Sequence, residues 1–224
     1  MGNHIGQHSQ YLDSSLPVLL ASSNMAKIEK LRMALEGVPR SISTPTELVI
    51  SIVIEETGIS HKEIAETKAL AWSNQICDYA VISTDGGALI PFLGSRWSSI
   101  YTGRFAGEKA SSMKKMRSLL ELMDGVDGNN REVIWIEALA VARNGEIAYS
   151  EVFEGATGRL MDIFDPTIQP DDFWLSTLLF YPQYSKVYNK LNLEERSAVK
   201  DPWCSIRDNL LGLFSNQRGS GSDT

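Results

Sequence analysis

Apolar and polar positions along the chain predict alternating strands and helices. The apolar run 17–21 predicts a strand, and the polar segment 22–24 after it predicts a loop. Ile28, Leu31 and Leu35 then recur at helical spacing. The chain therefore begins with a strand, a loop and a helix.

Three further segments extend this pattern. Residues 49–54 form a β-branched run that predicts a second strand, and residues 79–83 predict a third. Between them, residues 60–76 predict a helix whose first turn carries Ser60 and Glu63 at the spacing of a capping box.

The clearest hairpin signal lies in the second half of the chain. An apolar strand over 131–142 runs into Asn144-Gly145, and 146–154 runs back out. An antiparallel pair beside the first strands predicts an α/β fold with a mixed, twisted central sheet and flanking helices. Further helices are expected over 111–123, 193–199 and 204–214.

Length and composition favour one folded domain. With 224 residues and 43% hydrophobic content, the chain can bury a substantial core over residues 15–214. Residues 1–14 and 215–224 lack apolar periodicity and are expected to be flexible ends. The formal charge of -7 argues against the broad positive surface that a nucleic acid polymer requires.

The cysteines and histidines do not predict a zinc site. Cys77 and Cys204 stand alone, and His4, His8 and His61 do not complete a ligand cluster with them. We expect reduced thiols, with a disulfide as the alternative. The N-terminus is polar and no apolar run reaches the ~18 residues of a membrane span, which favours a cytoplasmic protein without membrane contact.

Candidate chemistry begins at the first loop. Ser22, Ser23, Asn24 and Lys27 stand where a strand meets a helix, and the unpaired N–H groups at a helix N-terminus favour anions. An ordinary N-cap is the alternative interpretation of the same residues.

A second candidate cation is Lys68, which interrupts an apolar helix face with Ile64 and Trp72 on either side. It is either a cation directed into a cleft or a side chain whose ammonium reaches water.

Candidate carboxylates follow two predicted strands. Asp85 precedes Gly86-Gly87 after the third strand, at an edge where open α/β sheets bind ligands, and a glycine pair lets a ligand approach the backbone. Glu55-Glu56 follows the second strand and offers metal oxygens. A simple turn at Asp85 and a solvated strand end at Glu55 remain the alternatives.

Taken in order, these motifs resemble the inosine triphosphate pyrophosphatase family. Ser22–Lys27 corresponds to the family's Thr-Gly-Asn-x-x-Lys, Glu55–Gly58 to its Glu-Glu-Thr-Gly, and Lys68-Ala69 to its Lys-Ala. Thr84–Gly87 corresponds to Asp-Asp-Ser-Gly, Tyr101–Glu108 to Tyr-Ser-Ala-Arg-Tyr-x-Gly-Glu, and Glu194–Ala198 to Glu-Glu-Lys-x-Ala. The family hydrolyses purine nucleoside triphosphates such as those of inosine and xanthosine to the monophosphate and pyrophosphate.

The resemblance implies roles for these residues. Asp85 and Lys68 would be catalytic, Lys27 and Lys68 would bind the triphosphate, and Glu55 with Asp85 would hold Mg²⁺. It also implies an elongated, two-lobed fold and a homodimer. The remaining substrate contacts would be Ser22, Ser23, Asn24, Gly86, Phe173, Trp174, Ser176 and Arg196.

The chain departs from the family where the base is read. Phe-Gly-Tyr/Trp-Asp-Pro becomes residues 173–177, Phe-Trp-Leu-Ser-Thr, and Ser-His-Arg becomes Lys200-Asp201-Pro202. Lys200 and Asp201 either replace the lost contacts or form a solvated loop. Thr84 also replaces the first of the paired aspartates. Three interpretations stay open: an enzyme with another nucleotide preference, such as a modified pyrimidine; a slow relic; and a silent nucleotide-binding or protein-interaction module.

Overall fold

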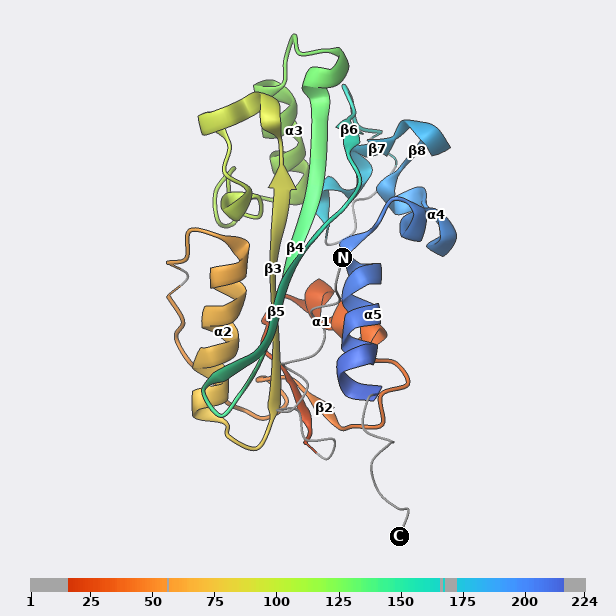
Figure 1. Cartoon of the computed structure of the whole chain (residues 1–224). Coiled ribbons are helices and arrows are strands. Elements are labelled where there is room, and N and C mark those ends of the chain that lie inside the picture. Colours follow the sequence, from red (N-terminus) through yellow and green to blue (C-terminus); the bar gives the residue numbers. More distant parts are fainter. Residues whose placement is uncertain (1–15, 56, 166, 168–172, 216–224) are drawn as a thin grey trace, which may run out of the picture. The chain divides into compact units, whose positions relative to one another are not determined.

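The computed structural model describes residues 16–55, 57–165, 167 and 173–215 (Figure 1). It divides into two compact units. Of the described residues, 16–55, 57–85, 137–153 and 203–215 belong to the first unit, and 86–136, 154–165, 167 and 173–202 belong to the second. The expected flexible ends lie outside the described residues, except that Ser215 ends a helix.

The first unit contains a mixed sheet flanked by helices. Strand β1 pairs in parallel with β2 and β3, β3 neighbours β4, and β4 pairs with β5. The mixed α/β architecture is therefore confirmed. The elements are β1 (Val18–Leu20), α1 (Met25–Ala34), β2 (Ile42–Ser43), α2 (His61–Gln75), β3 (Ala80–Leu89), β4 (Glu132–Arg143), β5 (Glu146–Glu154) and α5 (Pro202–Ser215), with β3 and β4 continuing into the second unit.

Strict alternation along the strands divides the core of this unit into two faces. Side chains of one parity pack with α1 and α5, and those of the other parity pack with α2, which lies on the opposite side of the strands (Figure 1). The α1 face holds Val18, Leu20, Ala80, Ile82, Leu139 and Val141; the α2 face holds Leu19, Ala21, Val81, Ala138, Ala140 and Ala142.

The helices begin where the sequence predicts. Asn24 caps α1 by accepting the Lys27 N–H, and Ser60 caps α2 by accepting the Glu63 N–H. The Glu63 carboxylate accepts the N–H of Ile59, one residue before the position that a full capping box would use.

The strand predicted over 49–54 is wrong. The segment makes local turns in which the N–H of Ile50 donates to Pro45, and Val49 has a φ of 55°. Ile52 and Ile54 pack against the α2 face, so their alternation reflects packing without strand pairing. The parallel edge strand is instead the two-residue β2.

The hairpin and later helices are confirmed. Asn144 and Gly145 have φ values of 50° and 77°, as the tight turn between β4 and β5 requires. Helix α5 begins at Pro202, two residues before the expected start.

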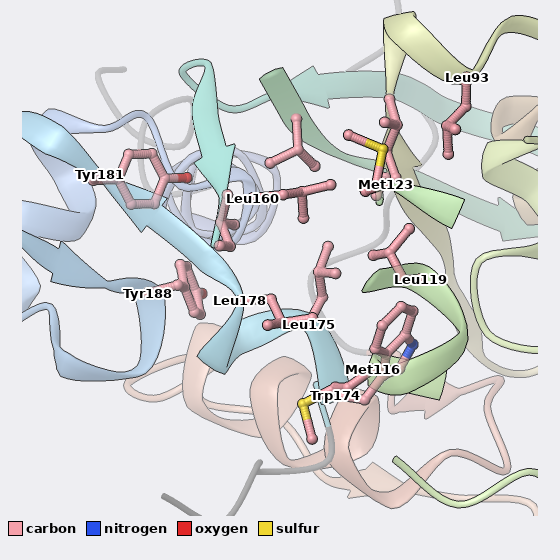
Figure 2. Packing of buried hydrophobic residues seen from close by; sticks show 14 of the residues in the cluster. Leu93, Met116, Leu119, Met123, Leu160, Trp174, Leu175, Leu178, Tyr181 and Tyr188 are labelled. Atoms are coloured by element: carbon pink, nitrogen blue, oxygen red, sulfur yellow. The ribbon is translucent and has the colours of Figure 1, made fainter. Parts of the chain in front are cut away.

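The second unit adds short antiparallel strands to its portions of β3 and β4. Its strands run β4-β6-β7-β8, and its core gathers aromatic and aliphatic side chains from β6, β7 and the neighbouring helices (Figure 2). The sequence analysis did not predict β6, β7 or β8, each of which has only two or three residues and shows no periodicity. The further elements are α3 (Ser112–Leu122), β6 (Gly158–Leu160), β7 (Leu179–Tyr181), β8 (Lys186–Val187) and α4 (Leu193–Ala198), with 3₁₀ turns at Pro91–Arg96, Ser99–Tyr101, Gly128–Arg131, Trp174–Thr177, Pro182–Tyr184 and Tyr188–Lys190.

Two smaller expectations also have an outcome. Cys77 and Cys204 do not form a disulfide in the structure. Among the described helices, none is long and apolar enough to cross a membrane.

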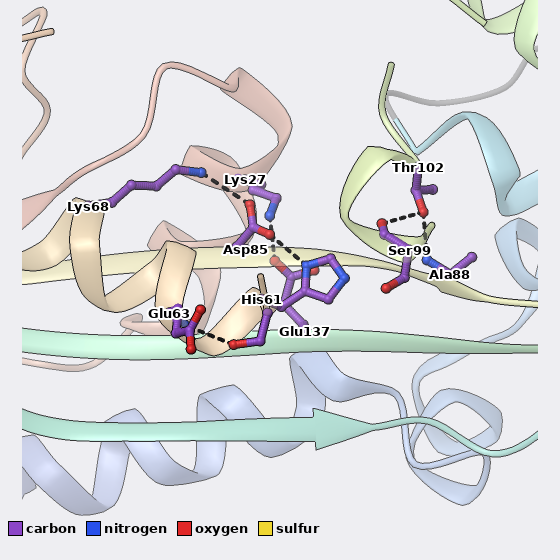
Figure 3. Close-up of polar contacts among 10 residues, drawn as sticks. Lys27, His61, Glu63, Lys68, Asp85, Ala88, Ser99, Thr102 and Glu137 are labelled. Carbon is purple, nitrogen blue, oxygen red and sulfur yellow. Dashed lines mark hydrogen bonds and ion pairs between the residues drawn. The ribbon is translucent and has the colours of Figure 1, made fainter. Parts of the chain in front are cut away.

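Gly87 on β3 is needed because the chain itself approaches its backbone. A Cβ at this position would lie 2.1 Å from the carbonyl oxygen of Ser99 and 2.8 Å from Oγ1 of Thr102. The same hydroxyl accepts the N–H of Ala88 and donates to Ser99 (Figure 3). A protein segment therefore occupies the space that the sequence alone attributes to a ligand at Gly87.

We expect Gly87→Ala to destabilise the protein by about 3 kcal/mol or more, because backbone atoms must move to admit the methyl group. Urea denaturation measures the change. Gly103→Ala is the matched control, since a Cβ there meets no atom within 4 Å. Equal stability of the two variants would contradict this account of Gly87.

Candidate functional site

The carboxylate of Asp85 is held by two side chains of α2 (Figure 3). Nζ of Lys68 lies 3.1 Å from Oδ1, and Nδ1 of His61 lies 2.6 Å from Oδ2. His61 and Lys68 are seven residues apart, which is two helical turns, so one face of α2 presents both groups. The three side chains are mostly buried, with exposed fractions of 16% for Asp85, 4% for His61 and 18% for Lys68.

These neighbours favour the ionised form of Asp85. Burial alone would raise its pKa, but the hydrogen bond from His61 and the charges of Lys27 and Lys68 lower the pKa below its ordinary value. Asp85 is therefore a carboxylate at neutral pH, ready to accept protons or bind cations.

A second ion pair lies on the α1 face of the sheet. Nζ of Lys27 lies 2.6 Å from Oε1 of Glu137, whose side chain is only 1% exposed. Glu137 interrupts the apolar interior of β4, and Lys27 belongs to the first turn of α1. Because Lys27 also lowers the pKa of Asp85, it links the two carboxylates electrostatically.

The loop before α1 is already ordered by its own contacts. Oγ of Ser22 accepts the N–H of Asn24, and Oδ1 of Asn24 accepts the N–H of Lys27. The N-cap interpretation is confirmed, and it leaves the exposed Ser23 and the polar atoms of this loop beside the helix N-terminus. Such a terminus still favours an anion.

Lys27, Lys68 and Asp85, which the sequence selected separately, are thus brought together. The ammonium of Lys68 donates to the carboxylate of Asp85. Gly86 follows Asp85 within β3 and is half-buried. Glu55 is exposed, no interaction recorded in the described structure joins it to Asp85, and its neighbour Glu56 lies outside the described residues.

The four candidate contacts for the base and phosphates lie in the second unit. Phe173 packs edge-on against Trp135 and Tyr188 at ring-centroid distances of 4.1 and 5.4 Å, and Trp174 packs against Phe105. Ser176 is fully buried, and the guanidinium of Arg196 lies 4.6 Å from the ring centroid of Tyr188. The structure therefore gives all four residues packing partners within this unit, and their role in nucleotide binding stays a prediction.

Asp201 does not lie in a solvated loop. It is 4% exposed and accepts a hydrogen bond of 2.7 Å from the hydroxyl of Tyr188, whose pKa is raised by burial and by the charge of Asp201. Lys200 beside it is exposed and has a φ of 51°. Only Lys200 fits the solvated-loop interpretation.

Sequence reasoning missed His61 and Glu137. The signal for His61 was its spacing of seven from Lys68 after the N-cap Ser60. The signal for Glu137 was a lone acid within an apolar strand, because a glutamate is almost never fully buried without a partner.

With this geometry known, comparison with other proteins defines the family. The model of the Ham1 family matches residues 18–204. The chain belongs to the Ham1 family. A dITP/XTP pyrophosphatase of Caldanaerobacter subterraneus is 29% identical over 82% of this chain and 89% of its own, and that of Escherichia coli K12 is 28% identical over 81% and 90%. A Ham1 protein from Coxiella burnetii has the same fold, with a TM-score of 0.74 at 20% identity over 89% of this chain and 98% of its own.

The match to the Ham1 family agrees with the resemblance of the individual motifs. The matched range contains Lys27, Lys68, Asp85 and also the two residues that the motifs did not reveal, His61 and Glu137. Thr84 stands where the family motif has an acid before Asp85, and this residue is 3% exposed.

The lowered pKa of Asp85 predicts how acid affects stability. A carboxyl group whose pKa falls on folding stabilises the protein above its ordinary pKa of 3.8, and this contribution is lost as the pH falls through the lower folded value. Asp85→Asn should therefore destabilise the protein at pH 7, and the difference from the wild type should shrink towards pH 3. Urea denaturation across this range measures it; a pH-independent difference would contradict the assignment.

The pair of Lys27 and Glu137 predicts strong coupling. Lys27→Met should cost about 3–5 kcal/mol, because it leaves a buried carboxylate without its cation. Adding Glu137→Gln should recover part of that loss, which a double-mutant cycle measures as a coupling of about 1–3 kcal/mol. Lys62→Met is the control, since its ammonium lies 3.9 Å from Glu66 and the side chain is 49% exposed. Additive effects would show that the two side chains do not interact.

Proposed function

We propose that this Ham1 protein hydrolyses purine nucleoside triphosphates such as those of inosine and xanthosine to the monophosphate and pyrophosphate. The observation that carries the proposal is the ionised Asp85, held by His61 and Lys68 with Lys27 nearby. Relatives over most of the chain are named dITP/XTP pyrophosphatases, which agrees with this chemistry.

The residues of the first unit suit phosphoryl chemistry by position and charge. Lys27 and Lys68 neutralise phosphate oxygens, and the loop at Ser22, Ser23 and Asn24 adds donors at a helix N-terminus. Asp85 accepts the proton of the attacking water while His61 and Lys68 fix the orientation of its two oxygens. Positioning and charge neutralisation supply most of the rate enhancement in such reactions.

The donor set fits magnesium. Among the described residues, no three His, Cys, Asp or Glu side chains form a metal cluster, but Mg²⁺ needs only one or two carboxylates when phosphates and waters complete its shell. Glu137 has a buried carboxylate oxygen without a recorded hydrogen bond, as a metal ligand would in the absence of its ion. As the family pattern implies, Asp85 and Glu55 would hold Mg²⁺ only together with the phosphates of a bound substrate, whose charge the ion would neutralise.

The remaining features of the proposal are a cytoplasmic location and a homodimer. The segment with Trp97, Tyr101 and Phe105 is a suitable place to look for a dimer contact, because Tyr101 is 54% exposed. Trp97 and Phe105, in contrast, pack on one another with ring centroids 4.9 Å apart.

Pyrophosphate release tests the function. The purified protein is assayed with magnesium and with chelator against standard, deaminated and modified pyrimidine nucleoside triphosphates. We expect magnesium-dependent release from the triphosphates of inosine, deoxyinosine and xanthosine. Activity confined to a pyrimidine would assign another base, and silence with every nucleotide at high enzyme concentration would favour a binding module on the same fold.

Asp85→Asn and Lys68→Met should lower kcat by a factor of about 100 or more, because each removes a charge at the reacting phosphates. Lys62→Met on the same helix is the control and should retain the wild-type rate, since its side chain is exposed. Full activity of Asp85→Asn would contradict the site assignment even if the fold were unchanged.

A further inference from the structure

Two buried oxygen atoms on neighbouring strands have no recorded hydrogen-bond partner. One is Oε2 of Glu137 on β4, and the other is Oγ1 of Thr84 on β3. Glu137 and Thr84 are 0% and 3% exposed, so bulk water does not satisfy these atoms. Since a buried polar group without a partner costs free energy, such atoms point to a missing ligand.

Both side chains belong to the α1 face of the sheet. Ile82 and Leu139, each two positions away, pack in the core cluster of α1, and alternation gives Thr84 and Glu137 the same side. The bond between Lys27 of α1 and Glu137 agrees with this placement. Asp85, of opposite parity, meets His61 and Lys68 on α2 instead.

Both residues are linked to the catalytic candidates, one through the chain and the other through Lys27. Thr84 precedes Asp85 in the chain, and Lys27 bonds to Glu137 while lowering the pKa of Asp85. These relations hold within the first unit, because Asp85 is its last residue on β3 and Glu137 is its first residue on β4.

We propose that Oε2 of Glu137 and Oγ1 of Thr84 bind a divalent cation, with Glu137 supplying the carboxylate that the Ham1 motif carries at position 84. Carboxylate and hydroxyl oxygens are hard ligands of the kind that Mg²⁺ takes beside phosphates. The identity of the ion as Mg²⁺ rests on the proposed function; the site itself rests on the two oxygen atoms.

Charge balance supports this site. In the structure a single ammonium at 2.6 Å compensates Glu137, and only Oε1 receives it. A divalent cation at Oε2 would neutralise the carboxylate and release Lys27 to a phosphate group. The structure with Lys27 on Oε1 and no partner at Oε2 among the described residues then represents the resting form, in which the lysine alone compensates the carboxylate.

Mn²⁺ serves as the probe, because electron paramagnetic resonance distinguishes free from bound Mn²⁺ without any turnover. The wild-type protein should bind Mn²⁺, and Glu137→Gln should bind it at least about tenfold more weakly. Thr84→Val should also weaken binding, with little change in side-chain volume. Glu132→Gln, an exposed glutamate on the same strand, should bind like the wild type.

A second test moves the carboxylate from position 137 to position 84, so the conclusion does not rest on the stability of Glu137→Gln alone. Thr84→Asp in the Glu137→Gln background restores a carboxylate at the position used by the family, so Mn²⁺ binding should return. Circular dichroism and thermal melting check that each variant is folded.

Equal Mn²⁺ affinity of the wild type and folded Glu137→Gln would overturn the proposal, as would absence of Mn²⁺ binding by the wild type at millimolar concentration. These results are independent of the reaction. Glu137-dependent Mn²⁺ binding without pyrophosphate release would support the site and reject the proposed function; pyrophosphate release with unchanged Mn²⁺ affinity in Glu137→Gln would do the reverse.

Discussion

The carboxylate of Glu137 is enclosed by protein, and one ammonium at 2.6 Å compensates its charge. Removing a carboxylate from water costs several kcal/mol, so this position on β4 is tolerable only if α1 delivers Lys27 to it. The start of α1 is fixed in turn by the cap at Asn24, directly after β1. One buried charge therefore constrains the strand, the loop and the helix around the candidate site.

The alternation of side chains along the strands places two charged clusters on opposite faces of the sheet. Strands carry the carboxylates, and helices on opposite faces carry the cations: Lys27 reaches Glu137 from α1, while His61 and Lys68 reach Asp85 from α2. Side chains anchored on regular elements hold their geometry better than side chains on loops. Glu55, in contrast, lies in the irregular segment before α2 and is exposed.

The sequence predicted those parts of the fold that depend on local chemistry. Asn144-Gly145 specified the hairpin, Ser60 specified the start of α2, and the order of motifs identified Lys27, Lys68 and Asp85. It failed where tertiary contacts decide. The alternating run at 49–54 packs its side chains against the α2 face without pairing its backbone. The role of Glu137 depends on its ion pair with Lys27, which is far away in the sequence.

The charged side chains and the aromatic candidates for base contact belong to different units of the chain. Lys27, Lys68, Asp85 and Glu137 lie in the first unit, whereas Phe173 packs with Trp135 and Tyr188 in the core of the second. A substitution at Phe173 therefore changes a hydrophobic core as well as any surface offered to a base. If Phe173 contacts the base, a substitution there changes base preference and the stability of the second unit together. The residues expected to read the base have therefore diverged in a different unit from the one that retains Lys27 and Lys68.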